Sequence, residues 1–208
     1  NESCVDNDLW EKIVSLGWTG IRIPEKYNGL GLGHLELCVI AEELGRFLAP
    51  VPFSSSVYLF TETIINYANE ELKKELLPKL VSGEIVGTLA VTEDFKAPSR
   101  DNILVSCENG LINGKKIAVP DAKIATHVIV VAKTNYGISL RLVDTSSSGV
   151  TIKHQKNIDE SRGHFQIDFD NVEGSLIGDE ISGWEQYESI INLSLIHISE
   201  PTRLLSIA

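Results

Sequence analysis

An alternating run of glycines, Gly29-x-Gly31-x-Gly33, is a pattern that could do chemistry, because glycine-rich backbone can cradle a phosphate. A dinucleotide-binding fingerprint needs G-x-G-x-x-G spacing between a strand and a helix. Here the spacing differs and the flanking segments are mostly helical in period. The pattern therefore favours a structural turn between helices, with a phosphate cradle as the alternative.

Other reactive residue types lack the spacing of a catalytic or metal site. Glu42 and Glu43 are adjacent, so on a helix they point about 100° apart and form a solvated face rather than an acid–base pair. Ser54-Ser55-Ser56 stands at an expected helix start, which favours capping over a nucleophilic role. The histidines show no H-x-H or H-E-x-x-H spacing and the cysteines no C-x-x-C, so no metal site is predicted. These residues are His34, His127, His154, His164 and His197, with Cys4, Cys38 and Cys107.

Residues 1–86 have the apolar spacing of amphipathic helices. Asn69 is the predicted N-cap of the last of these helices, because Glu70 and Glu71 follow it where the helix dipole favours negative charge. Pro78 either interrupts that helix or starts a second short one. The expected helices cover 5–16, 34–48, 54–67 and 69–83.

From Gly87 onward the apolar period changes from 3.6 to 2, which is typical of strands. Turn residues separate the strands, so the pattern predicts a small antiparallel barrel or sandwich. After Gly183 the pattern becomes helical again. The predicted fold class is α+β, with a helical domain over 1–86, a β-barrel domain over 87–180 and the start of a further helical domain over 181–208. The expected strands cover 87–92, 103–107, 111–119, 127–134, 138–144, 150–154 and 165–169.

Composition restricts the class of protein. The net charge of -11 argues against a nucleic-acid partner and against anionic lipid. The apolar stretches are too short to span a bilayer. Three widely spaced cysteines fit a reducing compartment, and we expect a cytoplasmic protein. A helical domain against a barrel creates a cleft between domains, where ligands often bind.

Several segments, in the same order along the chain, resemble the acyl-CoA dehydrogenase family over about residues 8 to 192. Each motif is weak by itself, and together they are specific. The matching segments are Leu16-Gly17-Trp18, Ile23-Pro24-Glu25, Gly29-Leu30-Gly31-Leu32, Glu42-Glu43-Leu44-Gly45-Arg46, Leu77-Pro78-Lys79-Leu80, Ser82-Gly83-Glu84, Leu89-Ala90-Val91-Thr92-Glu93, Ile112-Asn113-Gly114-Lys115-Lys116 and Leu176-Ile177-Gly178-Asp179-Glu180.

The resemblance implies an oxidoreductase acting on CH–CH donors in fatty acid metabolism. Such enzymes bind FAD, act on an acyl-CoA thioester, pass electrons to an electron-transfer flavoprotein and form homo- or hetero-oligomers. A carboxylate base from a C-terminal helical domain removes the α-proton, while the flavin accepts hydride from the β-carbon. We assign no catalytic residue in this chain, because the resemblance places that base beyond it, and we expect the chain by itself to be inactive.

The resemblance also assigns candidate cofactor-binding residues. Val91 and Thr92 match the strand that touches the flavin, and Ser99 lies near the place of a serine that contacts flavin phosphate or CoA. Val119 and Pro120 match the second flavin strand. That strand departs from the family's Trp-Ile-Thr run, because Ala118 and Pro120 stand where the aromatic ring and the hydroxyl are expected. The departure favours an alternative, a non-catalytic subunit or binding module of a hetero-oligomeric dehydrogenase.

The segment from Leu193 to Arg203 differs from the family's next helix. It resembles the translation of an adapter used in preparing sequencing libraries. We therefore expect the native reading frame to end near Asn192. The alternative is a native C-terminal helix that stops at Pro201.

Overall fold

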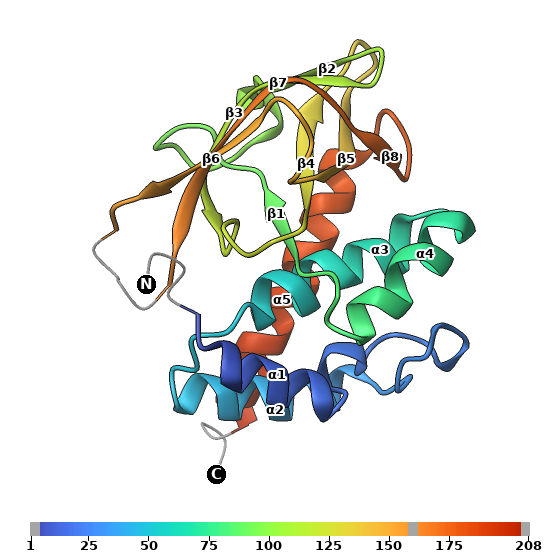
Figure 1. The fold of residues 1–208 in the computed structure, drawn as a ribbon, viewed down its shortest axis with the longest axis vertical. Helices are drawn as coiled ribbons and strands as arrows, with labels where there is room; N and C mark the ends of the chain where they lie inside the picture. The colour runs from blue at the N-terminus through green and yellow to red at the C-terminus, as the bar shows by residue number, and fades with distance from the viewer. Residues whose placement is uncertain (1–4, 158–161, 205–208) are drawn as a thin grey trace.

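The computed structural model describes residues 5–157 and 162–204, with helices α1 to α4 below a β-sheet and helix α5 running past both (Figure 1). The fold is therefore α+β, as predicted. The helical elements are α1 (Asn7–Ser15), η1 (Trp18–Gly20), η2 (Glu25–Tyr27), α2 (His34–Arg46), the π-helix η3 (Ser54–Thr61), α3 (Glu62–Tyr67), α4 (Glu70–Val81), η4 (Arg100–Asn102) and α5 (Gly183–Leu204).

Side-chain caps set where two of the helices begin. Asp6 accepts a hydrogen bond from the Leu9 amide of α1 at 2.9 Å, and Asn69 accepts one from the Leu72 amide of α4 at 2.9 Å. Each cap gives a partner to an amide that the first helical turn leaves unpaired. The cap predicted at Asn69 is confirmed. Pro78 neither interrupts α4 nor starts a new helix, because the leucines around it are buried and hold the last turn in place.

Eight strands form one sheet in the described part of the chain. Its order is β6-β7-β3-β2-β4-β5-β8, and β1 pairs with β4 off this path. The strands are β1 (Gly87–Ala90), β2 (Ser106–Glu108), β3 (Leu111–Pro120), β4 (His127–Lys133), β5 (Ile138–Asp144), β6 (Val150–Gln155), β7 (His164–Glu173) and β8 (Ser175–Ile177).

The antiparallel barrel predicted from the sequence is wrong, because the sheet is open and mixed. β1 runs parallel to β4, with Gly87 opposite His127, and β2 meets β4 in parallel at Ser106 and Lys133. The other strand pairs are antiparallel. An apolar period of two is the same in both kinds of pairing, so it does not report direction. β8 was not predicted, because three residues are too few to show a period.

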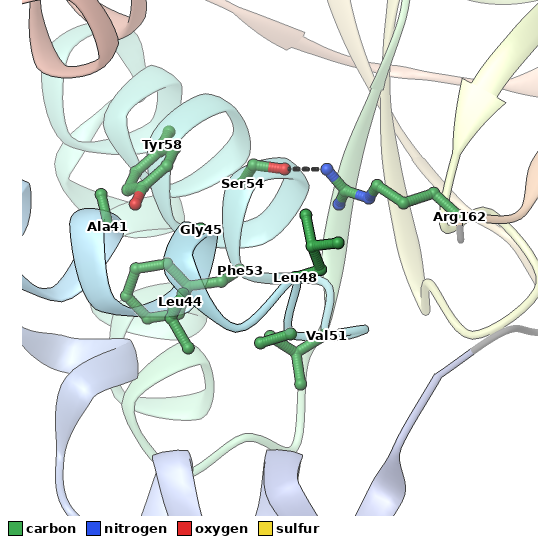
Figure 2. A pocket seen from close by; sticks show the side chains of 10 residues that line it. Ala41, Leu44, Gly45, Leu48, Val51, Phe53, Ser54, Tyr58 and Arg162 are labelled. Atoms are coloured by element: carbon green, nitrogen blue, oxygen red, sulfur yellow. Dashed lines mark hydrogen bonds between the residues drawn. The ribbon is translucent and has the colours of Figure 1, made fainter. Parts of the chain in front are cut away.

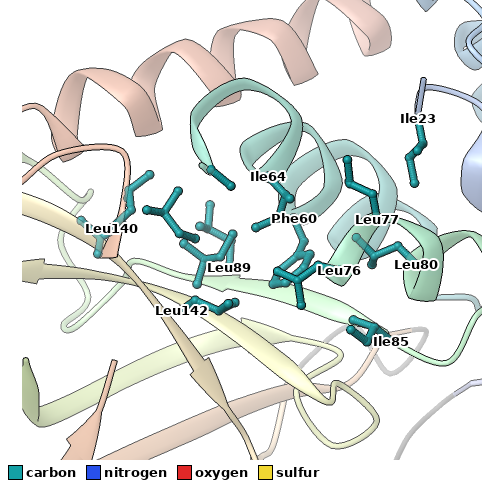
Figure 3. Packing of buried hydrophobic residues seen from close by; sticks show 14 of the residues in the cluster. Ile23, Phe60, Ile64, Leu76, Leu77, Leu80, Ile85, Leu89, Leu140 and Leu142 are labelled. Atoms are coloured by element: carbon teal, nitrogen blue, oxygen red, sulfur yellow. The ribbon is translucent and has the colours of Figure 1, made fainter. Parts of the chain in front are cut away.

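The largest core cluster fills the space between the helices and the sheet (Figure 3). Phe60 of η3, Ile64 of α3, Leu77 of α4, Leu89 of β1 and Leu142 of β5 are all buried in it. Burying each such side chain stabilises the fold by about 1.5–3 kcal/mol. The helical part and the sheet therefore share one apolar core.

The close approach of η3 to β1 depends on a glycine. A Cβ at Gly87 would lie 2.0 Å from Cγ of Phe60, which is far inside van der Waals contact. The Gly87 amide also donates to Oγ of Ser56 at 3.2 Å. The absence of a side chain at this position therefore sets the distance between the helices and the sheet.

Helix α5 begins at Gly183 and packs on the core through Trp184 and Ile190, which are 8% and 2% exposed. It continues across Pro201 to Leu204, so the helix end expected at Pro201 is not observed. Among the described residues, no helix combines the length and the apolar character needed to cross a bilayer.

Candidate functional site

The segment that ends β1 lies directly beside the last part of β3. The Ile117 amide donates to the Thr92 carbonyl at 2.8 Å, and the Thr88 hydroxyl donates to the Pro120 carbonyl at 2.7 Å. Nζ of Lys116 donates to the Val91 carbonyl at 2.9 Å. We call residues 88–93 and 116–120 the β1–β3 seam. Four of the five predicted cofactor residues fall within it.

A buried ion pair holds the seam together. Nζ of Lys116 lies 2.6 Å from Oε1 of Glu93, and the two side chains are 0% and 10% exposed. Burial lowers the pKa of Lys116 to about 8, against the attraction of Glu93. The Glu93 carboxylate also accepts from the Leu104 and Val105 amides, at 2.7 and 3.1 Å. One carboxylate therefore fixes β1, β3 and the residues before β2.

The predicted cofactor residues differ in the solvent exposure of their side chains. Val91, Thr92 and Pro120 are half-buried, whereas Val119 is 1% exposed and points into the sheet core. The Thr92 hydroxyl has no hydrogen-bond partner among the described residues, so it can bond to a ligand. Ser99 is exposed next to η4, and no described hydrogen bond joins it to the other four.

The chain changes direction sharply at the end of β3. The pairing with β7 shifts between Lys116 and Val119, and Ala118 adopts a left-handed φ of 51°. The Ala118 amide donates to Oε1 of Gln155 at 2.7 Å, and Pro120 has no amide hydrogen. This half of the seam presents neither an aromatic ring nor a hydroxyl group. It does not supply the side-chain contacts that the Trp-Ile-Thr run would give a flavin.

A second polar cluster joins the helices to the sheet and was not predicted. Asp121 is 3% exposed and accepts from Oγ of Ser55 at 2.6 Å and from Nη2 of Arg162 at 2.8 Å. Nη1 of Arg162 donates to Oγ of Ser54 at 2.6 Å. The capping role predicted for these serines is wrong, because Phe53 is the N-cap of η3 and the serine hydroxyls bond across the fold. Contacts over such sequence distances leave no local signal.

A pocket of about 260 Å³ lies beside this cluster, between α2 and η3. Arg162 stands at its edge and reaches Ser54, while apolar side chains form the other walls (Figure 2). We call it the α2–η3 pocket. Its lining residues are Ala41, Leu44, Gly45, Leu48, Ala49, Val51, Phe53, Ser54, Tyr58 and Arg162.

The glycine run 29–33 forms the turn between η2 and α2, as the sequence favours. All three glycine amides donate inside the protein, to the Pro24 carbonyl, the Ile23 carbonyl and the Glu36 carboxylate, at 3.3, 2.9 and 2.9 Å. A Cβ at Gly29 would lie 2.0 Å from the Ile23 oxygen. The amides are therefore occupied, and the structure gives no support to a phosphate cradle.

The adjacent glutamates of α2 form a solvated face, which confirms the prediction. Glu42 and Glu43 lie 3.2 and 3.4 Å from Nη2 of Arg46, and both are about half exposed. Pairs of this kind contribute little to stability. Among the histidine, cysteine, aspartate and glutamate side chains that the structure describes, no group of three or more could hold a metal ion.

Comparison with known proteins gives one consistent family. Residues 1–84 match the model described as acyl-CoA dehydrogenase, N-terminal domain. Isovaleryl-CoA dehydrogenase of Solanum tuberosum mitochondria is 33% identical over 154 residues, which cover 70% of this chain and 35% of that protein. An acyl-CoA dehydrogenase of Bacillus subtilis is 29% identical over an alignment of 216 positions with gaps, which covers 96% of this chain and 56% of that protein.

Solved structures show the same fold. Butyryl-CoA dehydrogenase from Megasphaera elsdenii superposes with a TM-score of 0.83 at 24% identity, covering 94% of this chain and 56% of that chain. The chain spans about a third of the length of the isovaleryl-CoA dehydrogenases that it matches.

Proposed function

Because this chain belongs to the acyl-CoA dehydrogenase family, we propose that it provides the flavin-facing part of an enzyme that dehydrogenates an acyl-CoA thioester between Cα and Cβ. Members of this family are FAD flavoproteins. The relevant chain segments are those of the β1–β3 seam. We propose Val91, Thr92, Ser99, Val119 and Pro120 as the cofactor-binding residues.

The observation that carries this proposal is the adjacency of the two seam segments. The 2.8 Å bond from Ile117 to Thr92 and the buried pair of Lys116 and Glu93 hold them in one fixed arrangement. A site that is rigid before the ligand arrives loses little conformational freedom on binding. The seam is therefore suited to hold a flat cofactor ring in a constant orientation.

The residues of the seam fit a flavin on one side only. On the Val91–Thr92 side, a half-buried hydroxyl without a described partner can donate to a ring acceptor. On the other side, Ala118 and Pro120 offer surface without side-chain donors. FAD, when bound, supplies the acceptor for the hydride from the β-carbon, and the chain's own residues bind and orient it. We assign no catalytic base among the described residues.

We further propose that the chain consists of three structural units, over 1–86, 87–180 and 181–208. We also propose that the chain is part of an oligomer, which transfers electrons to an electron-transfer flavoprotein. Cys107 is a free thiol in the structure, which supports a reducing location such as the cytoplasm. The acidic net charge of -11 gives no support to a nucleic-acid partner.

The test is FAD binding by the purified chain, followed by flavin absorbance and equilibrium titration. We expect Thr92→Val to weaken FAD binding about fivefold, because one neutral hydrogen bond contributes about 1 kcal/mol. Thr151→Val is the matched control, since Thr151 is exposed on β6 and outside the seam. A folded chain that retains no FAD at saturating concentration, or equal affinities for both variants, would contradict the assignment of the seam.

A second candidate function follows from Ala118 and Pro120. Residues 116–120 of the seam lack both an aromatic ring and a hydroxyl group. This lack favours a non-catalytic subunit that completes a cofactor or acyl-CoA site together with a catalytic partner. Such a subunit is colourless as purified, and dehydrogenase activity appears only after the partner is added. A yellow protein whose flavin is bleached by an acyl-CoA without any partner would exclude this alternative.

A further inference from the structure

The α2–η3 pocket is a ligand-sized cavity that shares no residue with the β1–β3 seam. At the packing density of protein interiors, about 0.75, a volume of about 260 Å³ holds about 190 Å³ of ligand atoms, or roughly ten non-hydrogen atoms. Its walls are formed mainly by leucine, valine, alanine and aromatic side chains. The pocket therefore suits a short apolar chain or a small ring.

Among the described residues that line the pocket, Arg162 is the single charged one, and it gives one end a polar character. Its charge is already balanced, because Nη2 bonds to the buried Asp121 carboxylate at 2.8 Å. The guanidinium has five N–H groups, and the described bonds to Asp121 and Ser54 use two of them. The remaining donors can bond to a neutral oxygen, whereas a carboxylate would give the group a net negative charge beside apolar walls, because Asp121 already balances Arg162.

Leu48 forms the rim of the pocket in a conformation that leucine rarely adopts. Its φ is +46° and its side chain is 79% exposed. Leu48 follows Phe47, the C-cap of α2, at the position where glycine is usual, and the Ala49 amide closes the helix end by donating to the Leu44 carbonyl at 2.9 Å. Glycine would adopt this backbone without steric cost. A leucine here is unfavourable for the backbone, and it places an exposed apolar side chain at the rim of the pocket.

From these three features we propose that the α2–η3 pocket binds a small uncharged molecule with an apolar chain of roughly eight to ten carbons and one oxygen acceptor, which lies against Arg162. The ligand's chain contacts Leu44, Leu48 and Phe53, and its oxygen accepts from the guanidinium. This proposal does not depend on FAD binding, since none of the seam residues takes part.

Isothermal titration of the 208-residue chain with 1-octanol tests the ligand class, with octanoate and octylammonium as matched probes of the same length. We expect saturable binding of 1-octanol at one site. Octanoate should bind at least tenfold more weakly, because Asp121 already balances the charge of Arg162 and the carboxylate would lose its hydration without compensation. Octylammonium should bind as weakly, because it offers no acceptor. Octanoate binding as tightly as 1-octanol, or no saturable binding of 1-octanol, would overturn the proposal.

Two variants test the location without endangering the fold. Gly45 lines the pocket and a Cβ there meets no atom within 4 Å, so Gly45→Phe adds a ring at the pocket wall without a clash at Cβ; it should abolish 1-octanol binding. Leu48→Gly relieves the left-handed strain, and it should keep or raise the melting temperature while weakening binding at least tenfold. Val39→Phe is the control, because Val39 is exposed on α2 outside the pocket. Unchanged affinity in Gly45→Phe or Leu48→Gly, or loss of affinity in Val39→Phe, would refute the site.

Discussion

The buried ammonium group of Lys116 should give this protein an unusual dependence of stability on pH. The pKa of Lys116 is about 8 in the fold, below its ordinary value of 10.5, because burial disfavours the charged form. Between these two values the unfolded chain holds a proton that the folded chain has lost. The free energy of unfolding therefore rises with pH in this window. At neutral pH both states are protonated, so the full cost of burying the charge is present.

The magnitude follows from the two pKa values. A group with a pKa of about 8 when folded and 10.5 when unfolded adds about 2 kcal/mol to the unfolding free energy between pH 7 and pH 9.5. The Lys116 side chain is fully buried, so solvent screening does not reduce this value appreciably. With a urea dependence of about 2 kcal/mol per molar, the unfolding midpoint should rise by about 1 M from this group.

The assay compares urea unfolding at the two pH values in the wild type, Lys116→Met and Lys115→Met. Methionine fills similar space without a charge, so the Lys116 variant should lose the rise, whatever its absolute stability. Lys115 is the neighbouring residue and is exposed, so its variant should keep the rise. Comparing pH differences, rather than absolute values, cancels the other titrating groups that the variants share.

Equal pH dependence in the wild type and Lys116→Met would refute the reasoning. It would mean that the Lys116 side chain is hydrated or rearranges, and that the ion pair with Glu93 does not hold the seam as described. The reasoning would also be refuted if the urea midpoint of the wild type fell between pH 7 and pH 9.5 and Lys116→Met abolished that fall. The sign of the pH dependence would then be opposite to the one expected.

Three further substitutions test the fold and the seam. Glu93→Gln leaves the Lys116 ammonium buried without its counter-charge and should lower the unfolding free energy by about 3 kcal/mol in urea titration; a loss below about 1 kcal/mol would contradict the pairing. Gly87→Ala places a methyl group inside the Phe60 ring contact and should cost about 3 kcal/mol or prevent folding, as judged by circular dichroism and urea unfolding. Asn69→Ala removes the cap of α4 and should lower the unfolding free energy by about 1 kcal/mol, which corresponds to a fall of about 3 °C in melting temperature. A fall above about 10 °C would show that the Asn69 side chain has a role beyond capping.

Local sequence determined the elements and some of their boundaries. The N-cap at Asn69, the turn at Gly29–Gly33 and most strand positions after Gly87 were predictable, because caps, turns and periodicity depend on residues a few positions apart. The family resemblance had the same origin, since its motifs are short segments in a fixed order. The sequence also predicted the α+β class from the change of period at the start of the sheet.

Only the tertiary structure determined which strands pair and which side chains are in contact. The parallel pairing of β1 with β4 depends on a long crossover, and the apolar period of a strand does not indicate its direction. The sequence showed Lys116 only as part of a family motif, and its contact with Glu93 appears in the fold alone. Arg162 likewise contacts Asp121, which lies 41 residues away in sequence. Contacts at such separations come from closing long loops around a shared core, and no local pattern encodes which ends will meet. The sequence by itself therefore determined the parts and their family, while the fold decided the seam, the buried charge and the α2–η3 pocket.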